Sequence, residues 1–151
     1  MKKDISIVVD DSKLNVRTGV IFRHNGKVLI EISKVGSNST IPGGRVKFNE
    51  KSEDTAVREI NEELELNLDK TRLKHKKTLE NFFNAEGLNF HEIYFIYEYN
   101  LNDSEVKRLE AARDNADNAN TYFEFVDYKN LDKVNILPEN LIDIIKEWGI
   151  R

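Results

Sequence analysis

The chain has 151 residues, of which 39% are hydrophobic and 33% are charged, and its formal net charge is −4. This composition is typical of a globular domain with a core, and it excludes a disordered or collagen-like chain. No apolar run approaches the roughly 20 residues of a transmembrane helix, and the absence of cysteine excludes disulfides and thiolate metal sites. We therefore expect a single domain over residues 1–151, in the cytoplasm and without a membrane partner, because no secretory signal is recognisable.

The charge pattern also argues against nucleic acid as a partner. Nucleic-acid binders usually present a basic stripe, whereas the lysines here are scattered and cluster briefly at residues 74–77. We interpret that cluster as lysine at a sheet edge, where it discourages edge pairing, with phosphate binding as the alternative. An acidic protein that handles phosphates would need a cation to bridge the like charges.

The predicted elements alternate between strands and helices. Residues 16–22 and 27–32 predict a hairpin around Asn25-Gly26, because Asn-Gly favours a tight turn. Residues 42–44 predict a loop, and residues 52–64 a helix. Residues 79–83 and 90–99 predict a second hairpin around 84–87, followed by a strand at 122–126. Residues 138–148 predict a closing helix whose apolar face comprises Leu141, Ile144, Ile145 and Trp148.

This order predicts an α/β (α+β) fold, with a mixed sheet and helices packed on it. The polar, acidic segment 102–120 is not fixed by its pattern. Residues 104–113 could form a short helix capped by Ser104. Long polar loops are often functional, and a simple surface excursion is the alternative.

The helix at residues 52–64 has clear start signals and an apolar stripe. Ser52 is placed to cap its free amides, and acidic residues follow in the first turn, where they complement the dipole. Ala56, Ile60 and Leu64 recur every four residues and predict the buried face.

Acidic side chains gather on the opposite face of this helix. Glu59, Glu62 and Glu63 are three and four residues apart, so they are neighbours on the surface. Like charges at these spacings cost about 0.2–0.5 kcal/mol per pair. The cluster is reasonable if a hard cation such as Mg²⁺ binds there. The alternative is a solvated acidic face on which Arg58 pairs with Glu62.

The spacing around these glutamates resembles the Nudix box: glycine, five residues, glutamate, seven residues, Arg-Glu, an aliphatic, any residue, Glu-Glu, any residue, glycine and an aliphatic. The matching positions are Gly44, Glu50, Arg58, Glu59, Ile60, Glu62, Glu63 and Leu66. The second glycine of the pattern is Glu65 here, and residues 41–44 (Ile-Pro-Gly-Gly) resemble the usual lead-in.

The resemblance implies a Nudix-type α/β/α sandwich around a mixed sheet. It implies cleavage of a phosphoanhydride in a nucleoside diphosphate linked to another group, such as a nucleoside triphosphate or a sugar nucleotide like ADP-ribose. The cofactor is expected to be Mg²⁺, with Mn²⁺ as the alternative. Homodimers are common in this family, although no segment here identifies an interface. The competing hypothesis is a domain that kept the fold, lost turnover, and senses nucleotides or binds protein.

The resemblance also implies roles for individual residues. Glu59, Glu62 and Glu63 match the catalytic and metal-binding glutamates, with Glu63 and Glu59 as the first choices for direct ligands. The carbonyl of Gly43 matches a backbone ligand.

Other parts of the box are expected to be architectural. Glu50 and Arg58 match an ion pair that ties the loop to the helix, and Gly44 belongs to the same structural motif.

The general base is left open by the resemblance. It is either a box glutamate, for which Glu59 is a candidate, or an acid of the later polar segment. The candidates there are Glu110, Asp114 and Asp117.

Glu65 is the one departure from the box. A left-handed glutamate would cost about 1 kcal/mol, and Asn67 tolerates that conformation better. We therefore expect the helix to end later, near Leu66 or Asn67, and activity to survive.

Candidate substrate contacts lie on the strands. Arg17 could bind a phosphate or simply sit at a sheet end. Phe83, His91 and Tyr94 are placed on the second hairpin, together with Phe82, and aromatic rings there could stack on a base. The alternative is that they belong to the core, as most strand aromatics do.

Overall fold

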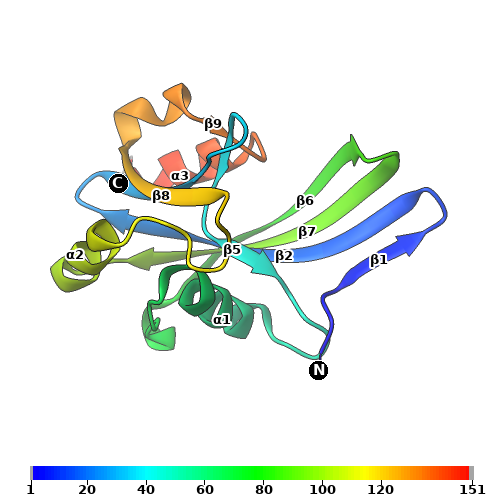
Figure 1. The fold of residues 1–151 in the computed structure, drawn as a ribbon, viewed down its shortest axis with the longest axis horizontal. Coiled ribbons are helices and arrows are strands. Elements are labelled where there is room, and N and C mark those ends of the chain that lie inside the picture. The colour runs from blue at the N-terminus through cyan, green and yellow to red at the C-terminus, as the bar shows by residue number, and fades with distance from the viewer. Residues whose placement is uncertain (1, 150–151) are drawn as a thin grey trace.

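The computed structural model describes residues 2–149, the last two of these by their backbone alone. A curved sheet separates α1 and α2 on one side from α3 on the other (Figure 1). The strands are β1 (Ser6–Val9), β2 (Ser12–His24), β3 (Lys27–Ser33), β4 (Asn38–Thr40), β5 (Gly43–Arg45), β6 (Lys74–Ala85), β7 (Leu88–Asn100), β8 (Thr121–Asp127) and β9 (Asn135–Ile136). The helices are α1 (Ser52–Leu64), α2 (Asp103–Ala111) and α3 (Leu141–Gly149), with 3-10 turns η1 (Lys70–Arg72) and η2 (Tyr128–Lys133).

The sheet is mixed, as expected. Its main path runs β6-β7-β2-β3-β4-β9, while β1 and β5 pair with β2, and β8 pairs with β3. The long strands β2 and β7 run parallel, and β6 and β7 form the second predicted hairpin. The lysines at residues 74–77 lie at the start of β6, which is an edge strand, so their expected position at a sheet edge is confirmed.

Two cores lie on the two faces of the sheet. Successive strand side chains point to opposite faces, and β2 shows this directly. Val20 and Phe22 pack in the core that contains Ile60 of α1, whereas Ile21 packs in the core that contains Ile144 of α3. The expected three-layer α/β/α arrangement is therefore confirmed.

Strands β2 and β3 diverge soon after the turn that joins them. They pair only at Arg23↔Val28 and at the adjoining residues, after which β2 takes β5 as its partner and β3 takes β4. This separation brings the glycines of β5 and the side chains of β3 to the same region as α1. The candidate site lies there.

The Asn25-Gly26 turn has the backbone that its sequence favours, and the Glu86-Gly87 turn has the same backbone although positive φ is unfavourable for glutamate. Asn25 and Gly26 have φ values of 47° and 74°, and Glu86 and Gly87 have 54° and 76°. Positive φ at both central residues is the type I′ geometry that matches strand twist. The two predicted hairpins are confirmed.

Some sequence predictions were wrong. Residues 43–45 form strand β5 rather than a loop, because glycine allows this segment to press against β2. A Cβ on Gly43 would collide with the carbonyl oxygen of Thr18. The helices also start differently: Lys51 is the N-cap of α1, while the Ser52 hydroxyl bonds that of Tyr97 at 2.6 Å.

Helix α2 is capped two residues earlier than expected. Asn102, not Ser104, accepts the hydrogen bond of the Glu105 amide, and the Glu105 side chain accepts that of Asn102, which makes a capping box.

Glu65 itself ends α1. It takes the left-handed conformation, with φ 52° and ψ 37°, so the helix does not continue to Leu66 or Asn67. The Arg108 guanidinium donates two hydrogen bonds to the Glu65 carbonyl. That contact offsets part of the conformational cost.

Helix α3 begins at Leu141, three residues after Pro138, and buries Leu141, Ile144 and Ile145 as predicted. The side chain of Trp148 lies outside the described residues. Among the helices that the structure describes, none has the length and apolarity to cross a membrane.

Candidate active site

A bidentate ion pair ties the loop before α1 to the helix. Arg58 donates from Nε to Glu50 Oε2 at 2.8 Å and from Nη2 to Glu50 Oε1 at 3.0 Å. Glu50 also accepts from the Thr55 hydroxyl and the Lys47 amide. The hydrogen bonds from Arg58 hold the pKa of Glu50 at about 2. The expected pair is present, in a geometry that fixes the loop.

The depressed pKa of Glu50 predicts an acid-sensitive fold. Its stabilising contribution is complete above its ordinary pKa, near 4.5, and is lost as pH falls toward 2. We expect Glu50→Gln to lower the free energy of unfolding by roughly 2–3 kcal/mol at pH 7, since each pKa unit corresponds to about 1.4 kcal/mol. The difference between variant and wild type should shrink steadily below pH 4 in urea denaturation. A constant difference across that range would contradict the assignment.

The carboxylates of Glu59, Glu62 and Asp117 converge. One oxygen atom from each lies within 4.8 Å of the other two. Arg58 bonds Glu59 at 2.9 Å and Glu62 at 3.4 Å, so it offsets part of the repulsion. Asp117 comes from the loop between α2 and β8, and it is the one of the three proposed loop acids that reaches this cluster.

Glu63 occupies the buried end of the site. Its Oε1 accepts from the Gly43 amide at 3.1 Å, and its Oε2 accepts from Asn115 Nδ2 at 3.1 Å. Burial, with the nearby carboxylate of Glu31, raises the pKa of Glu63 to about 9. Burial also raises the pKa values of Glu31 and Glu59. Several carboxylates therefore share a poorly solvated space.

Asn115 joins these groups to the loop. Its side-chain amide reaches Glu63 and also Glu31, at 3.3 Å, while its Oδ1 accepts from the backbone amides of Asp117 and Asn118 at 2.8 and 3.0 Å. The residue is 5% exposed. One buried side chain thus fixes both the buried carboxylates and the turn that carries Asp117.

A divalent cation fits this donor set. The side chains offer carboxylate oxygens, the donors that Mg²⁺ prefers, and uncompensated carboxylates this close would repel one another. The site also has room for the Glu59 carboxylate, because Gly44 has no side chain. A Cβ there would lie 2.6 Å from Oε1 of Glu59.

Gly44→Ala should displace the Glu59 carboxylate. We expect activity to fall by about 100-fold, as misplacements near 1 Å can cost that much. Gly36→Ala is the matched control, because its Cβ would have only an ordinary contact, 3.7 Å from Ser33 Oγ. The measurement is the steady-state activity of the two variants. Equal activities of Gly44→Ala and Gly36→Ala would show that activity does not depend on the position of the Glu59 carboxylate.

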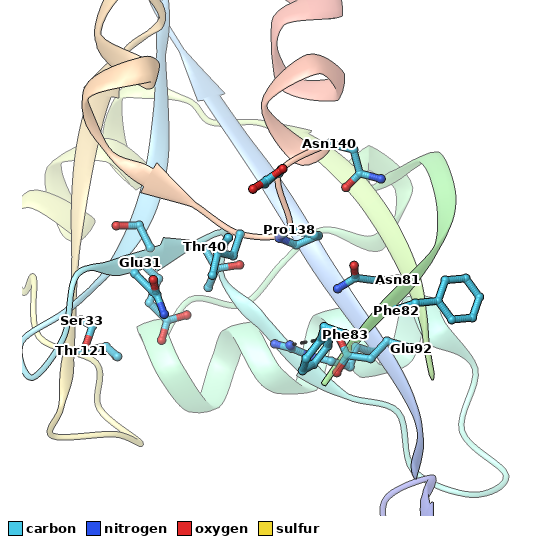
Figure 2. Close-up of a pocket in the computed structure, with 15 residues that line it drawn as sticks. Glu31, Ser33, Thr40, Asn81, Phe82, Phe83, Glu92, Thr121, Pro138 and Asn140 are labelled. Atoms are coloured by element: carbon cyan, nitrogen blue, oxygen red, sulfur yellow. Dashed lines mark ion pairs between the residues drawn. The ribbon is translucent and has the colours of Figure 1, made fainter. Parts of the chain in front are cut away.

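A pocket of about 760 Å³ adjoins the acidic site (Figure 2). Its lining side chains come from the strands and from the segment that precedes α3, and they include Arg17, Glu31, Thr40, Asn81, Phe83, Glu92, Pro138 and Asn140. In Figure 2, Glu31 lies on the opposite side of the pocket from Phe83 and Glu92. Arg17 contacts Glu92 at 3.9 Å.

The structure separates the proposed substrate contacts into two groups. Arg17 and Phe83 line the pocket. Tyr94 is 1% exposed and packs in the core with α3, and His91 bonds Glu80 at 3.0 Å and contacts the Phe82 ring. Neither Tyr94 nor His91 lines this pocket, because Tyr94 is buried in the core and His91, next to Glu92 on the strand, points to the other face of β7.

Two of the loop acids also lie elsewhere. Asp114 is largely exposed and pairs with Lys34 at 3.0 Å. Glu110 is on α2, beside a smaller hollow formed with Arg113 and Phe123.

Sequence reasoning missed Glu31, Asn115 and Glu92. Glu31 interrupts an otherwise apolar strand, and Glu92 shares its strand face with the buried Phe90 and Tyr94. A carboxylate at each of these strand positions could have indicated a functional residue. Nothing local marks Asn115, whose importance comes from contacts 52 and 84 residues away in the chain.

Comparisons with known proteins agree with this geometry. The family model described as NUDIX domain matches residues 13–143. The structure is similar to a MutT Nudix hydrolase from Burkholderia pseudomallei (18% identity, TM-score 0.66), covering 88% of this chain and 96% of that one. It is also similar to a MutT protein from Methanosarcina mazei Go1 (14%, TM-score 0.63; 95% and 97%).

An Ap4A hydrolase from C. elegans is similar in fold as well (16% identity, TM-score 0.58; 91% of this chain and 97% of that one). None of the curated proteins matches the chain. The family match covers most of the sequence, and the solved structures share its fold. The chain therefore belongs to the Nudix domain family and is a Nudix hydrolase.

Proposed function

We propose that the protein is a divalent-metal-dependent pyrophosphohydrolase that cleaves a phosphoanhydride bond in a nucleoside diphosphate linked to another group. A nucleoside triphosphate and a sugar nucleotide such as ADP-ribose are both candidate substrates. The observation that carries the proposal is the convergence of Glu59, Glu62 and Asp117 beside the buried Glu63, at one end of a large pocket. Mg²⁺ is the proposed cofactor, with Mn²⁺ as a substitute.

The first proposed role of the site is to bind the cation. Glu59, Glu62 and Glu63 would hold the cation, with Asp117 near them and the Gly43 carbonyl as a further ligand. The cation, when bound, would neutralise phosphate oxygens and lower the pKa of a coordinated water.

Side chains of the protein would contact the phosphate and take the proton of the attacking water. Arg17 lines the pocket and lies 3.9 Å from Glu92, and we assign it a contact with a phosphate. A carboxylate must take the proton of the attacking water as the P–O bond breaks. We assign that role to Asp117, because Glu110 and Asp114 lie away from the site and Glu59 is bonded to Arg58.

Asn115→Ala should weaken the site without removing a ligand. We expect kcat/KM and Mn²⁺ affinity each to fall by about 10–100-fold, as happens when groups that orient ligands are lost. Asn118→Ala, in the same turn but exposed, is the control and should change neither value. Kinetics together with calorimetric Mn²⁺ titration would test this. An unchanged Mn²⁺ affinity in Asn115→Ala would contradict the positioning role.

The proposed function is tested with a substrate panel. The protein is incubated with Mg²⁺ and nucleoside triphosphates, ADP-ribose and dinucleoside polyphosphates, and released phosphate, pyrophosphate or nucleoside monophosphate is measured with and without chelator. Chelator-sensitive release from at least one member is expected. Binding of nucleotides without turnover on the whole panel would instead support a nucleotide-sensing domain.

A further inference from the structure

The end of the pocket remote from the catalytic carboxylates has a polar centre with aromatic flanks. Glu92 on β7 lies opposite Asn15 on β2 and opposite Asn81 on β6, so these side chains form one row across three strands. The next row contains Phe90 and Phe83, which are paired in the same register. Glu92, Asn81 and Phe83 line the pocket (Figure 2).

The Glu92 carboxylate is buried and held in one orientation. The residue is 5% exposed. Its Oε2 accepts from Asn15 Nδ2 at 3.3 Å, and Asn15 in turn accepts from the Ser6 hydroxyl at 2.7 Å. The hydrogen bonds from Ser6 on β1 to Asn15 on β2, and from Asn15 to Glu92, therefore fix the orientation of the carboxylate.

The other oxygen of Glu92 retains hydrogen-bonding capacity. Within the described part of the chain, its nearest cationic group is Arg17 Nη1, at 3.9 Å, which is too long for a hydrogen bond. Buried carboxylates normally have partners. A carboxylate accepts hydrogen bonds and cannot donate them, so the matching ligand group is an N–H or O–H donor.

The aromatic flank favours a flat ligand. Phe83 stacks on Phe90 with ring centroids 4.7 Å apart and an angle of 16°, and Lys13 lies over the Phe90 ring. Phe83 ends the stack and is 40% exposed. A nucleobase would extend the stack and cover its outer face, as bases do on aromatic side chains.

The charge balance decides which part of a substrate fits this end. The pocket is lined by Glu31, Glu92 and Glu139, against Arg17 as its cation in the described residues. Anionic phosphate is therefore disfavoured against the Glu92 carboxylate itself, because the cluster of carboxylates that could hold a cation lies elsewhere, at Glu59, Glu62 and Asp117. At the opposite end, Glu31 is linked through Asn115 to Glu63, so the phosphates belong there.

We propose that Glu92 and Phe83 form a base subsite that selects nucleobases carrying an exocyclic amino group. This inference rests on the proposed function, because it assumes that the phosphates bind at the carboxylate cluster. An amino group gives the N–H donor that Glu92 accepts, as acidic side chains do with the amino group of cytosine. The ring stacks on Phe83.

Matched nucleotides test the subsite. GTP and ITP differ by one amino group, and CTP carries an amino group where UTP has a carbonyl oxygen. Affinities are measured by calorimetry with Mg²⁺ on the Glu63→Gln protein, in which turnover is expected to be lost. We expect the amino-bearing member of each pair to bind about tenfold more tightly, the ratio for one charge-assisted hydrogen bond.

Variants then assign the selection to Glu92. Adding Glu92→Gln should bring both ratios close to one, whereas Glu80→Gln removes the same charge from an exposed position outside the pocket and should leave them unchanged. Phe83→Leu, at an exposed position, should weaken every nucleotide alike and preserve the ratios. Thermal unfolding checks that each variant is folded.

Equal affinities within both pairs would overturn the inference, as would ratios that persist in folded Glu92→Gln. If Glu92→Gln does not fold, the ratios in the Glu63→Gln protein and in its Phe83→Leu variant still decide. Wild-type hydrolysis of the same nucleotides is measured in parallel. Hydrolysis without a difference in affinity between the paired nucleotides would contradict the base subsite and leave the proposed reaction standing. Selective binding without hydrolysis would contradict the proposed reaction and leave the base subsite standing.

Discussion

Glu63→Gln should abolish hydrolysis while leaving the fold intact. The carboxylate is buried at the centre of the acidic site, bonded to the Gly43 amide and to Asn115. Metal-ion catalysis supplies several kcal/mol of charge stabilisation, and each 1.4 kcal/mol is tenfold in rate, so we expect kcat to fall by about 10²–10⁴-fold. The measurement is Mg²⁺-dependent hydrolysis of the best substrate of the panel.

The amide is nearly isosteric and uncharged, like the protonated carboxyl group that a pKa of about 9 favours at pH 7 in the metal-free protein. The melting temperature of Glu63→Gln without metal should therefore be close to that of the wild type. Glu65→Gln is the control, with the same change two residues away at an exposed position. It should retain activity. Equal hydrolysis by wild type and Glu63→Gln would show that the site is wrongly assigned.

Arg23→Gln should be the most destabilising of these substitutions. Arg23 is 1% exposed, and it joins the sheet to the helix on one face. Its guanidinium donates to Glu98 at 3.3 Å, to the Tyr128 hydroxyl at 2.7 Å and to the Ile145 carbonyl of α3 at 3.0 Å. Removing one partner of a buried pair costs about 3–5 kcal/mol, because the other groups lose their compensation.

That loss corresponds to a fall in melting temperature of about 10 °C for a domain of this size. Arg45→Gln is the matched control, since its pair with Asp4 is exposed and 4.0 Å long. Exposed pairs contribute about 0–1 kcal/mol. A shift in Arg23→Gln no larger than that in Arg45→Gln would mean that the buried contacts do not hold α3 against the sheet.

Local sequence patterns predicted the elements that have strong local signals. The helix Ser52–Leu64 was predicted with its observed bounds, since its apolar stripe is regular. The first hairpin was predicted because Asn-Gly tolerates positive φ, and the second because two strand-like segments flank residues 84–87. The short strands β4 and β9 were missed, because two or three residues carry no periodicity. The strand β5 was missed because glycines there indicate a loop unless a partner strand is known.

The site was predictable where it lies on one helix. Helical spacing predicted that Glu59, Glu62 and Glu63 are neighbours, and their role in the site, like the pairing of Glu50 with Arg58, follows from the resemblance. Asn115 and Glu31 could not be predicted this way, because their roles arise where the divergence of β2 from β3 brings distant segments together.

Glu65 shows the limit of a conformational rule. The cost of a left-handed glutamate argued for a later helix end, yet the helix ends at Leu64 and Glu65 takes that conformation. Hydrogen bonds from Arg108, 43 residues away in the chain, act on its carbonyl. A tertiary contact thus offsets a local preference.

The central claim is that the acidic cluster of α1 binds a divalent cation on which hydrolysis depends. Calorimetric titration of Mn²⁺ into the wild type and into Glu63→Gln tests it most directly. We expect saturable binding to the wild type, weakened by about tenfold or more in the variant, since each lost 1.4 kcal/mol is a factor of ten. Equal Mn²⁺ affinity in the two proteins, or no binding to the wild type, would contradict the claim.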